Sequence, residues 1–240
     1  MSQADATVGI AGAVAKDSDG EEKQTTNQRL ATLGNDLSSL VHAACIQSRV
    51  THRDERCQAG AVVVAATVAC ALVNKFDLRS KAGKLELLNY LALLTNPINK
   101  EFAALLADKM PAWLEQKPKK AVVLIAKAGL SPNYDDGTPG ISGFVITSVL
   151  WALYSFLRFP FSYWGTVECA IACGGDVDST AAMAGAMSGA FLGEKAIPQV
   201  FKEAIHDQGG WKRAELLQLA HAAWESKDRR TPVLDYLVKK

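Results

Sequence analysis

Apolar residues recur every three or four positions along most of this chain. The spacing is clearest over residues 37–45 and 85–94, where leucines and other apolar residues return with each helical turn. Such spacing places apolar side chains on one face of an α-helix. The pattern therefore predicts a succession of packed helices. The same spacing extends over residues 59–72, 102–107, 122–130, 144–157, 167–173, 181–192 and 214–224.

Prolines separate these segments. A proline lacks the backbone N–H that a helix interior needs, so it ends or restarts a helix. The sequence has no convincing run of alternating apolar and polar residues bounded by turns, so we expect no sheet. The chain is predicted to be all-α, a compact orthogonal bundle of many helices. The breaks are expected at Pro97, Pro111, Pro118, Pro132, Pro139, Pro160 and Pro198.

The first 28 residues differ from the rest. They are rich in Gly, Ser, Asp, Glu and Thr, and their acidic residues have no apolar period beside them. A polar, charged stretch of this kind buries too little apolar surface to fold. We expect residues 1–28 to be a mobile tail. Residues 29–240 are expected to form one helical domain, since a chain of 240 residues is within the size of a single core.

The charge balance argues against two classes of partner. The chain has 26 Lys and Arg and 25 Asp and Glu, a formal net charge of +1. Such a chain has no long-range field that would attract nucleic acid or an anionic membrane. The longest apolar run, residues 59–73, is shorter than the roughly 20 residues that span a bilayer, and is expected to be a buried helix. We expect neither partner, and any anionic ligand must be held locally.

The cysteines indicate the compartment. Cys45, Cys57, Cys70, Cys169 and Cys173 form no Cys-x-x-Cys pair, and none has a closely spaced His that would complete a zinc site. Buried free thiols are therefore favoured over a redox or zinc role. Because free thiols are typical of a reducing compartment, we expect a cytoplasmic protein.

One segment carries candidate chemistry. Gly174 and Gly175 allow a sharp turn before a helix, and Asp176, Asp178 and Ser179 place two carboxylates and a hydroxyl at the amino end of that helix. Oxygen ligands of this type suit Mg²⁺, Mn²⁺ or Ca²⁺. Three ligands do not fill six coordination positions, so water and other segments would have to contribute. The segment predicts part of a hard-cation site.

A simpler interpretation of this segment stays open. Asp178 could be an N-cap residue, and Asp176 could complement the helix dipole. That interpretation explains one aspartate well and two aspartates poorly. Gly185 and Gly189, further along the helix, are expected to give a smooth face for close helix packing.

Residues 174–193 resemble the Gly-Gly-Asp-x-Asp-Thr-x-Ala-Ala-x-x-Gly-x-x-x-Gly-Ala-x-x-Gly signature of the ADP-ribosylglycohydrolases. Ile197 and Pro198 follow where that family has Ile-Pro. Two upstream motifs resemble the same family. Gly143 and Phe144 look like its Gly-aromatic helix start beside the ADP-ribose pocket, and His52 lies in a turn like its Thr-His-x-Asp turn.

The resemblance implies a set of site residues. It places His52, Gly143 and Phe144, together with Gly174 and Gly175, beside bound ADP-ribose. The family also holds two Mg²⁺ ions at the bottom of its cleft, with ligands from a carboxyl-terminal Asp-x-Asp-Thr and an amino-terminal Thr-Asp-Asp.

The metal ligands transfer only in part. The first ligand set becomes Asp176, Asp178 and Ser179, where Ser keeps the ligating oxygen of Thr. The second set is not found, because the chain contains neither Thr-Asp-Asp nor the family's Gly-Asp-x-x-Gly; Asp135 and Asp136 are expected to lie in a turn. We therefore interpret the chain as resembling the family without its amino-terminal segment. No catalytic residue is assigned, because in some members that segment supplies it.

The function implied by the resemblance is magnesium-dependent hydrolysis of the glycosidic bond in ADP-ribosylated protein or a related ADP-ribose conjugate. The alternative is a family member that is catalytically inactive and has a structural or ADP-ribose-binding role. The expected partner is ADP-ribose or an ADP-ribosylated protein, and we expect a monomer.

Overall fold

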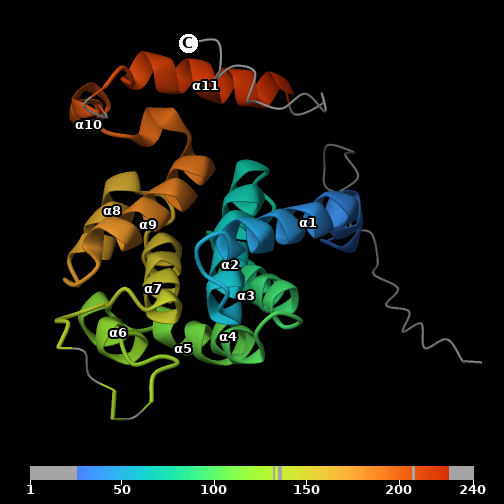
Figure 1. The fold of residues 1–240 in the computed structure, drawn as a ribbon, viewed down its shortest axis with the longest axis vertical. Coiled ribbons are helices and arrows are strands. Elements are labelled where there is room, and N and C mark those ends of the chain that lie inside the picture. Colours follow the sequence, from blue (N-terminus) through green and yellow to red (C-terminus); the bar gives the residue numbers. More distant parts are fainter. Residues whose placement is uncertain (1–25, 132, 135–136, 207–208, 227–240) are drawn as a thin grey trace, which may run out of the picture.

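The computed structural model describes residues 26–131, 133–134, 137–206 and 209–226, and over these residues the regular structure is helical, with two isolated bridges, Ile141 with Gly175 and His206 with Lys212. Figure 1 shows the arrangement. The predicted all-α class is confirmed. The elements in order are α1 (Thr26–Arg49), α2 (Glu55–Leu72), α3 (Lys81–Thr95), α4 (Lys100–Ala104), the π-helical turn η1 (Leu105–Lys109), α5 (Met110–Leu114), α6 (Pro118–Ile125), α7 (Val145–Arg158), α8 (Tyr163–Ile171), α9 (Val177–Leu192), the 3-10 turn η2 (Glu194–Ala196), α10 (Gln199–Ala204) and α11 (Arg213–Ser226).

The central helix of the fold is α7. Every residue from Ile146 to Leu157 is buried, so α7 is enclosed on all sides, by α2, α5, α6, α8 and α9. A fully buried helix has to satisfy its polar side chains internally. The Trp151 Nε1–H donates to the carbonyl of Ala170 at 3.1 Å, and the Tyr154 hydroxyl donates to the carbonyl of Gln116 at 2.8 Å. These bonds fix α7 to α8 and to the end of α5.

Helix α2 is the second core element. Its 18 residues are long and apolar enough to cross a bilayer by length and composition alone. Half of them are buried inside the protein, and α2 packs against α1, α3, α7 and α9. At Gly60 the approach to α7 is so close that a Cβ would lie 2.7 Å from Cγ2 of Val145. The packing is that of a core helix, as the sequence predicts.

Most of the predicted helices are present, and two predictions need correction. The chain does not break at Pro111: the Met110 amide donates to the Leu105 carbonyl in η1, and the chain continues as α5. The backbone N–H that Pro111 lacks is not needed here, because the π-helical turn before it has already shifted the hydrogen-bond pairing. The helix predicted at residues 122–130 begins at Pro118 and ends at Ile125, since Gly129 takes a left-handed φ of 68° against α7.

The predicted tail lies almost wholly outside the described residues, and its last three residues, 26–28, belong to α1. At the other end of the chain, α10 and α11 lie beyond α8 and α9 (Figure 1). Glu194 anchors this part, since its carboxylate pairs with Lys202 at 3.3 Å and Arg213 at 2.7 Å. Trp164 of α8 stacks on Phe201 of α10, with ring centroids 5.1 Å apart.

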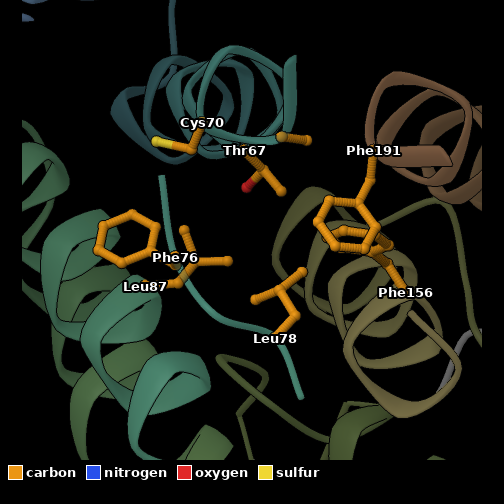
Figure 2. Close-up of a pocket in the computed structure, with 8 residues that line it drawn as sticks. Thr67, Cys70, Phe76, Leu78, Leu87, Phe156 and Phe191 are labelled. Carbon is orange, nitrogen blue, oxygen red and sulfur yellow. The ribbon is translucent and has the colours of Figure 1, made fainter. Parts of the chain in front are cut away.

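The core is closely packed. Figure 2 shows one gap in it, between Thr67 and Cys70 of α2, Leu78, and the rings of Phe156 and Phe191. Its volume is about 10 Å³, so it holds about one water at most and no ligand. The five cysteines are free, and burial raises the pKa of the Cys70 thiol to about 11. A thiol with a raised pKa is less reactive near neutral pH.

Lys75 is an exception within this core. It is only 8% exposed, and its Nζ has no hydrogen-bond partner in the described part of the chain. The ammonium lies 4.0 Å from the ring centroid of Tyr90 and 5.7 Å from that of Phe76. Burial lowers the pKa of Lys75. A desolvated cation–π contact contributes about 2 kcal/mol or more, and desolvating an ammonium costs several kcal/mol, so we expect the unpaired charge to be a net destabilising feature.

We expect Lys75→Met to stabilise the protein. Methionine keeps the length of the apolar stem and removes the unpaired charge, so the free energy of unfolding at pH 7 should rise by about 1 kcal/mol. The folded pKa of Lys75 lies below its unfolded value, so the penalty is complete at neutral pH and is relieved as pH rises through the folded pKa. The advantage of the variant should therefore shrink towards pH 10. Urea unfolding at both pH values measures it.

Lys119→Met is the matched control, because Lys119 is exposed. It should change stability little at either pH. A Lys75→Met protein that is less stable than the unsubstituted protein at pH 7 would show that the cation–π contacts outweigh desolvation.

Candidate functional site

The predicted cation-binding segment forms the start of α9. Gly174 and Gly175 both take left-handed φ values, 74° and 79°, and turn the chain into the helix. Asp176 is the N-cap residue, and its backbone carbonyl accepts hydrogen bonds from the amide and the hydroxyl of the buried Thr180, at 3.2 and 3.0 Å. Asp178 lies in the first turn. The interpretation of Asp178 as a simple N-cap is therefore wrong.

The carboxyl groups of Asp176 and Asp178 influence each other's ionisation. The Asp176 side chain makes no capping hydrogen bond, which leaves it available for other contacts. Interaction with the Asp176 carboxyl is the largest cause that lowers the pKa of Asp178, followed by the backbone N–H groups of Ser179 and of Asp178 itself. Asp178 and Ser179 are exposed, and Asp176 is half-buried. Two acidic oxygens and a hydroxyl thus face solvent together.

A backbone bridge joins this segment to the start of α7. The Ile141 amide donates to the Gly174 carbonyl at 3.3 Å, and the Asp176 amide donates to the Ile141 carbonyl at 2.8 Å. The chains approach too closely for side chains, since a Cβ on Gly140 would lie 2.1 Å from the Cys173 oxygen and one on Gly175 2.0 Å from the Ile141 oxygen. Glycine is required at both positions.

The bridge brings the Gly143–Phe144 motif to the carboxylates. A Cβ on Gly143 would lie 3.5 Å from Oδ2 of Asp176, so the carboxylate is directed at the exposed backbone of Gly143. Phe144 is the N-cap residue of α7, and its amide donates to the Ser142 hydroxyl at 3.3 Å. The structure therefore places Gly143, Gly174, Gly175 and the two aspartates together.

The third motif reaches this site through an arginine. Asp54 is the N-cap residue of α2, and its carboxylate accepts from the Arg56 amide at 2.8 Å and pairs with the Arg56 guanidinium at 2.6 Å. That guanidinium lies 5.3 Å from the ring centroid of Phe144. Sequence reasoning missed Arg56, because a local pair with Asp54 is visible as a pattern but the contact with α7 is not.

His52 is exposed in the turn before α2. Its Nδ1 lies 2.9 Å from the Thr51 hydroxyl, and its amide donates to the Ser48 carbonyl at 2.8 Å. These contacts keep His52 within its own turn, and its predicted role towards the ligand stays a prediction.

A polar cavity of about 470 Å³ opens beside this turn. Arg49, Arg53, Glu55 and Gln58 line it, along with Cys45, Pro97 and Ile98. The Arg49 Nε–H donates to Gln58 at 2.8 Å, and the Gln58 amide donates to the Arg53 carbonyl at 3.1 Å. Both arginines thus belong to one ordered group, which sequence reasoning did not single out.

The donor set allows a test of the predicted magnesium ions. Among the described residues there is no group of three or more His, Cys, Asp or Glu that could hold a metal. Two carboxylates and the Ser179 hydroxyl fit part of the shell of one hard cation, with water completing it. They do not fit two ions, since each needs about six oxygens.

Gly140→Ala tests the backbone bridge. Alanine here would combine a strained φ of 93° with a Cβ 2.1 Å from a carbonyl oxygen. The two backbone segments of the bridge must separate, so we expect a loss of about 3 kcal/mol or more in the free energy of unfolding, measured by urea titration.

The control is Gly137→Ala, where φ is 71° but no atom lies within 4 Å of the new Cβ. This variant isolates the cost of placing alanine at a left-handed φ, about 1–2 kcal/mol in the free energy of unfolding. Equal losses in the two variants would contradict a bridge that depends on close approach.

Asp54→Ala tests the start of α2. Loss of the N-cap should lower the free energy of unfolding by about 1 kcal/mol at pH 7, while Asp54→Asn, which keeps a capping oxygen, should lose less. The hydrogen bond from Arg56 lowers the pKa of Asp54 to about 2. Its carboxylate contribution is therefore complete above pH 4 and lost as pH falls towards 2.

The measurement is thermal unfolding of both variants and the unsubstituted protein between pH 7 and pH 2. The ion pair is exposed, so solvent screening keeps its own share small. A deficit of Asp54→Ala that is unchanged at pH 2 would contradict the role of the charged carboxylate.

Comparison with known proteins places this geometry in a family. No curated protein and no solved structure matches the chain. The family model of ADP-ribosylglycohydrolase matches residues 11–232, which is most of the chain and includes all three motifs. The chain belongs to the ADP-ribosylglycohydrolase family.

Proposed function

We propose that this protein hydrolyses the glycosidic bond of ADP-ribosylated protein or a related ADP-ribose conjugate, with a divalent cation such as Mg²⁺ held by Asp176, Asp178 and Ser179. The observation that carries the proposal is the backbone bridge, which directs the Asp176 carboxylate at the exposed Gly143. Family membership supplies the class of substrate.

Each part of the site has a distinct task. Gly143, Gly174 and Gly175 lack side chains, so a sugar could approach the backbone next to the carboxylates. Phe144, with Arg56 over its ring, forms one wall. When bound, the cation would coordinate the ribose hydroxyls and supply an activated water.

The charge on the sugar sets the electrostatic requirement. Glycosidic bonds break through a transition state in which positive charge develops on the ring. The carboxylates of the half-buried Asp176 and the exposed Asp178 are suitably charged to stabilise it. The polar cavity beside the His52 turn contains positive charge, and Arg49 and Arg53 would be available there to a diphosphate that reaches it, with Glu55 as the acidic residue of that lining.

A second candidate is a protein that binds ADP-ribose without cleaving it. It is favoured by the donor set, because the described residues hold no third acidic ligand beside the two aspartates. The two candidates share the binding site and differ in turnover.

The first experiment is calorimetric titration of ADP-ribose into the protein, with and without about 5 mM Mg²⁺, a concentration that saturates ordinary carboxylate sites. We expect binding that depends on Mg²⁺ and that weakens by about tenfold or more in Asp176→Asn, since the cation loses a charged ligand. Asparagine preserves the helix start, because Asp176 makes no side-chain capping bond.

Asp108→Asn is the matched control, because it makes the same change at an exposed aspartate on η1. This variant should bind ADP-ribose like the unsubstituted protein. Release of ADP-ribose from an ADP-ribosylated protein then separates the candidates: turnover supports the hydrolase, and binding without turnover supports the second candidate. Absence of binding in both conditions would contradict both.

A further inference from the structure

A second charged cavity lies at the opposite end of α7 from the candidate site. It has a volume of about 220 Å³ and is formed by the start of α3, by α5 and by Arg158 in the last turn of α7. The 14 residues of α7 separate the two ends by about 20 Å, at 1.5 Å per residue. The cavity is therefore distinct from the site at the start of α7 and α9.

Positive charge dominates this cavity. Arg79, Lys81, Lys84 and Arg158 line it, and Glu115 is the one acidic residue of the lining. Glu115 is engaged by Lys81, with 2.8 Å between its Oε1 and the lysine Nζ. Within the described residues, the other three cations have no carboxylate within ion-pair distance.

The unpaired cations are held in place by other contacts. The Arg79 guanidinium lies 5.8 Å from the ring centroid of Phe161, and that of Arg158 lies 6.0 Å from the ring centroid of Phe159. Contacts with aromatic rings orient a guanidinium without neutralising it. Both guanidinium groups thus keep hydrogen-bond donors for a ligand.

The start of α3 adds to the positive potential. Ser80 caps the helix by accepting from the Gly83 amide at 3.0 Å, and the first turn contains no acidic residue. The amino end of a helix carries a partial positive charge that favours anions. This helix instead carries Lys81 and Lys84 there, an arrangement that is repulsive until an anion is present.

Lys84 and Arg158 repel each other. Its pKa is lowered, first by burial and then by the charge of Arg158, although Glu115 opposes the shift. The half-buried Lys84 and the exposed Arg158 therefore lie close enough to repel each other, and Glu115, which is paired with Lys81, offsets this repulsion only in part. An anion with charge of about −2 would relieve this repulsion and accept hydrogen bonds from both groups.

The floor of the cavity is apolar. Leu85, Leu114 and Leu157 line it together with Pro111. Leu157 is fully buried, and the other two leucines are half-buried. A ligand with a compact anionic head and an apolar body matches a cationic rim over a leucine floor better than a bare ion does.

We propose that the cavity between α3, α5 and the end of α7 binds a small phosphate monoester, with the phosphate held by Arg79, Lys84 and Arg158 and its apolar substituent on the leucine floor. The phosphate dianion matches the three unpaired cations in charge, and the guanidinium fork matches its geometry. The inference concerns a site separate from the aspartates and does not depend on the proposed hydrolase activity.

The experiment uses phenyl phosphate and inorganic phosphate as probes, titrated into the full chain by calorimetry at constant ionic strength with sodium chloride. We expect saturable binding of phenyl phosphate, and weaker binding of inorganic phosphate, which lacks the apolar group. Lys84→Gln and Arg158→Gln should each weaken the affinity for phenyl phosphate by about tenfold, the effect of losing one charge-assisted hydrogen bond.

Two controls define the outcome. Lys119→Gln changes an exposed lysine of α6 and should leave the affinity unchanged. Asp176→Asn should also leave it unchanged, which separates this cavity from the site at α9. No saturable binding of either probe, or an affinity that Lys84→Gln and Arg158→Gln leave intact, would overturn the proposal.

Discussion

The candidate site depends on one short stretch of backbone pairing. Ile141 exchanges hydrogen bonds with Gly174 and Asp176, and this pairing fixes the start of α7 beside the start of α9. Because α7 is buried from Ile146 to Leu157, its packing then fixes this pair of helix starts relative to the rest of the core. Because the α-carbons of Gly140 and Gly175 lie against carbonyl oxygens of the facing segment, neither position tolerates a side chain. Gly140, Gly175 and the two backbone hydrogen bonds of Ile141 thus decide where the carboxylates lie.

The start of α2 is placed by a different contact. Gly60 allows α2 to approach Val145 within van der Waals distance, and four residues earlier Arg56 reaches across to the ring of Phe144. Three helices therefore begin near one another, and their amino ends share the partial positive charge of helix dipoles. Acidic residues cap two of them, Asp54 on α2 and Asp176 on α9. The same geometry would favour a phosphate or a hydrated cation held by carboxylates.

The sequence predicts the helices well because periodicity depends on burial, and α7 is buried from Ile146 to Leu157, which is most of the segment predicted at residues 144–157. It predicts boundaries less well where a backbone device intervenes. The π-helical pairing before Pro111 and the left-handed Gly129 leave no periodic signal. The candidate site was divided in the same way. The signature identified Asp176 and Asp178, whereas Arg56 comes to the site only through its contact with Phe144, which spacing along a single chain does not encode.

A net charge near zero conceals a separation of charge along α7. Acidic groups gather where α7 begins, and Arg158 lies where it ends, so both ends complement the helix dipole. That complement would explain one arginine at the carboxyl end, but it does not explain Arg79 and Lys84, which lie at the unfavourable end of α3. The dipoles of α7 and α3 act there in opposite senses, so they largely cancel and the side-chain charges decide the potential. The three unpaired cations of this cavity therefore produce a local positive potential that favours an anion, even though the net charge of the whole chain is close to zero.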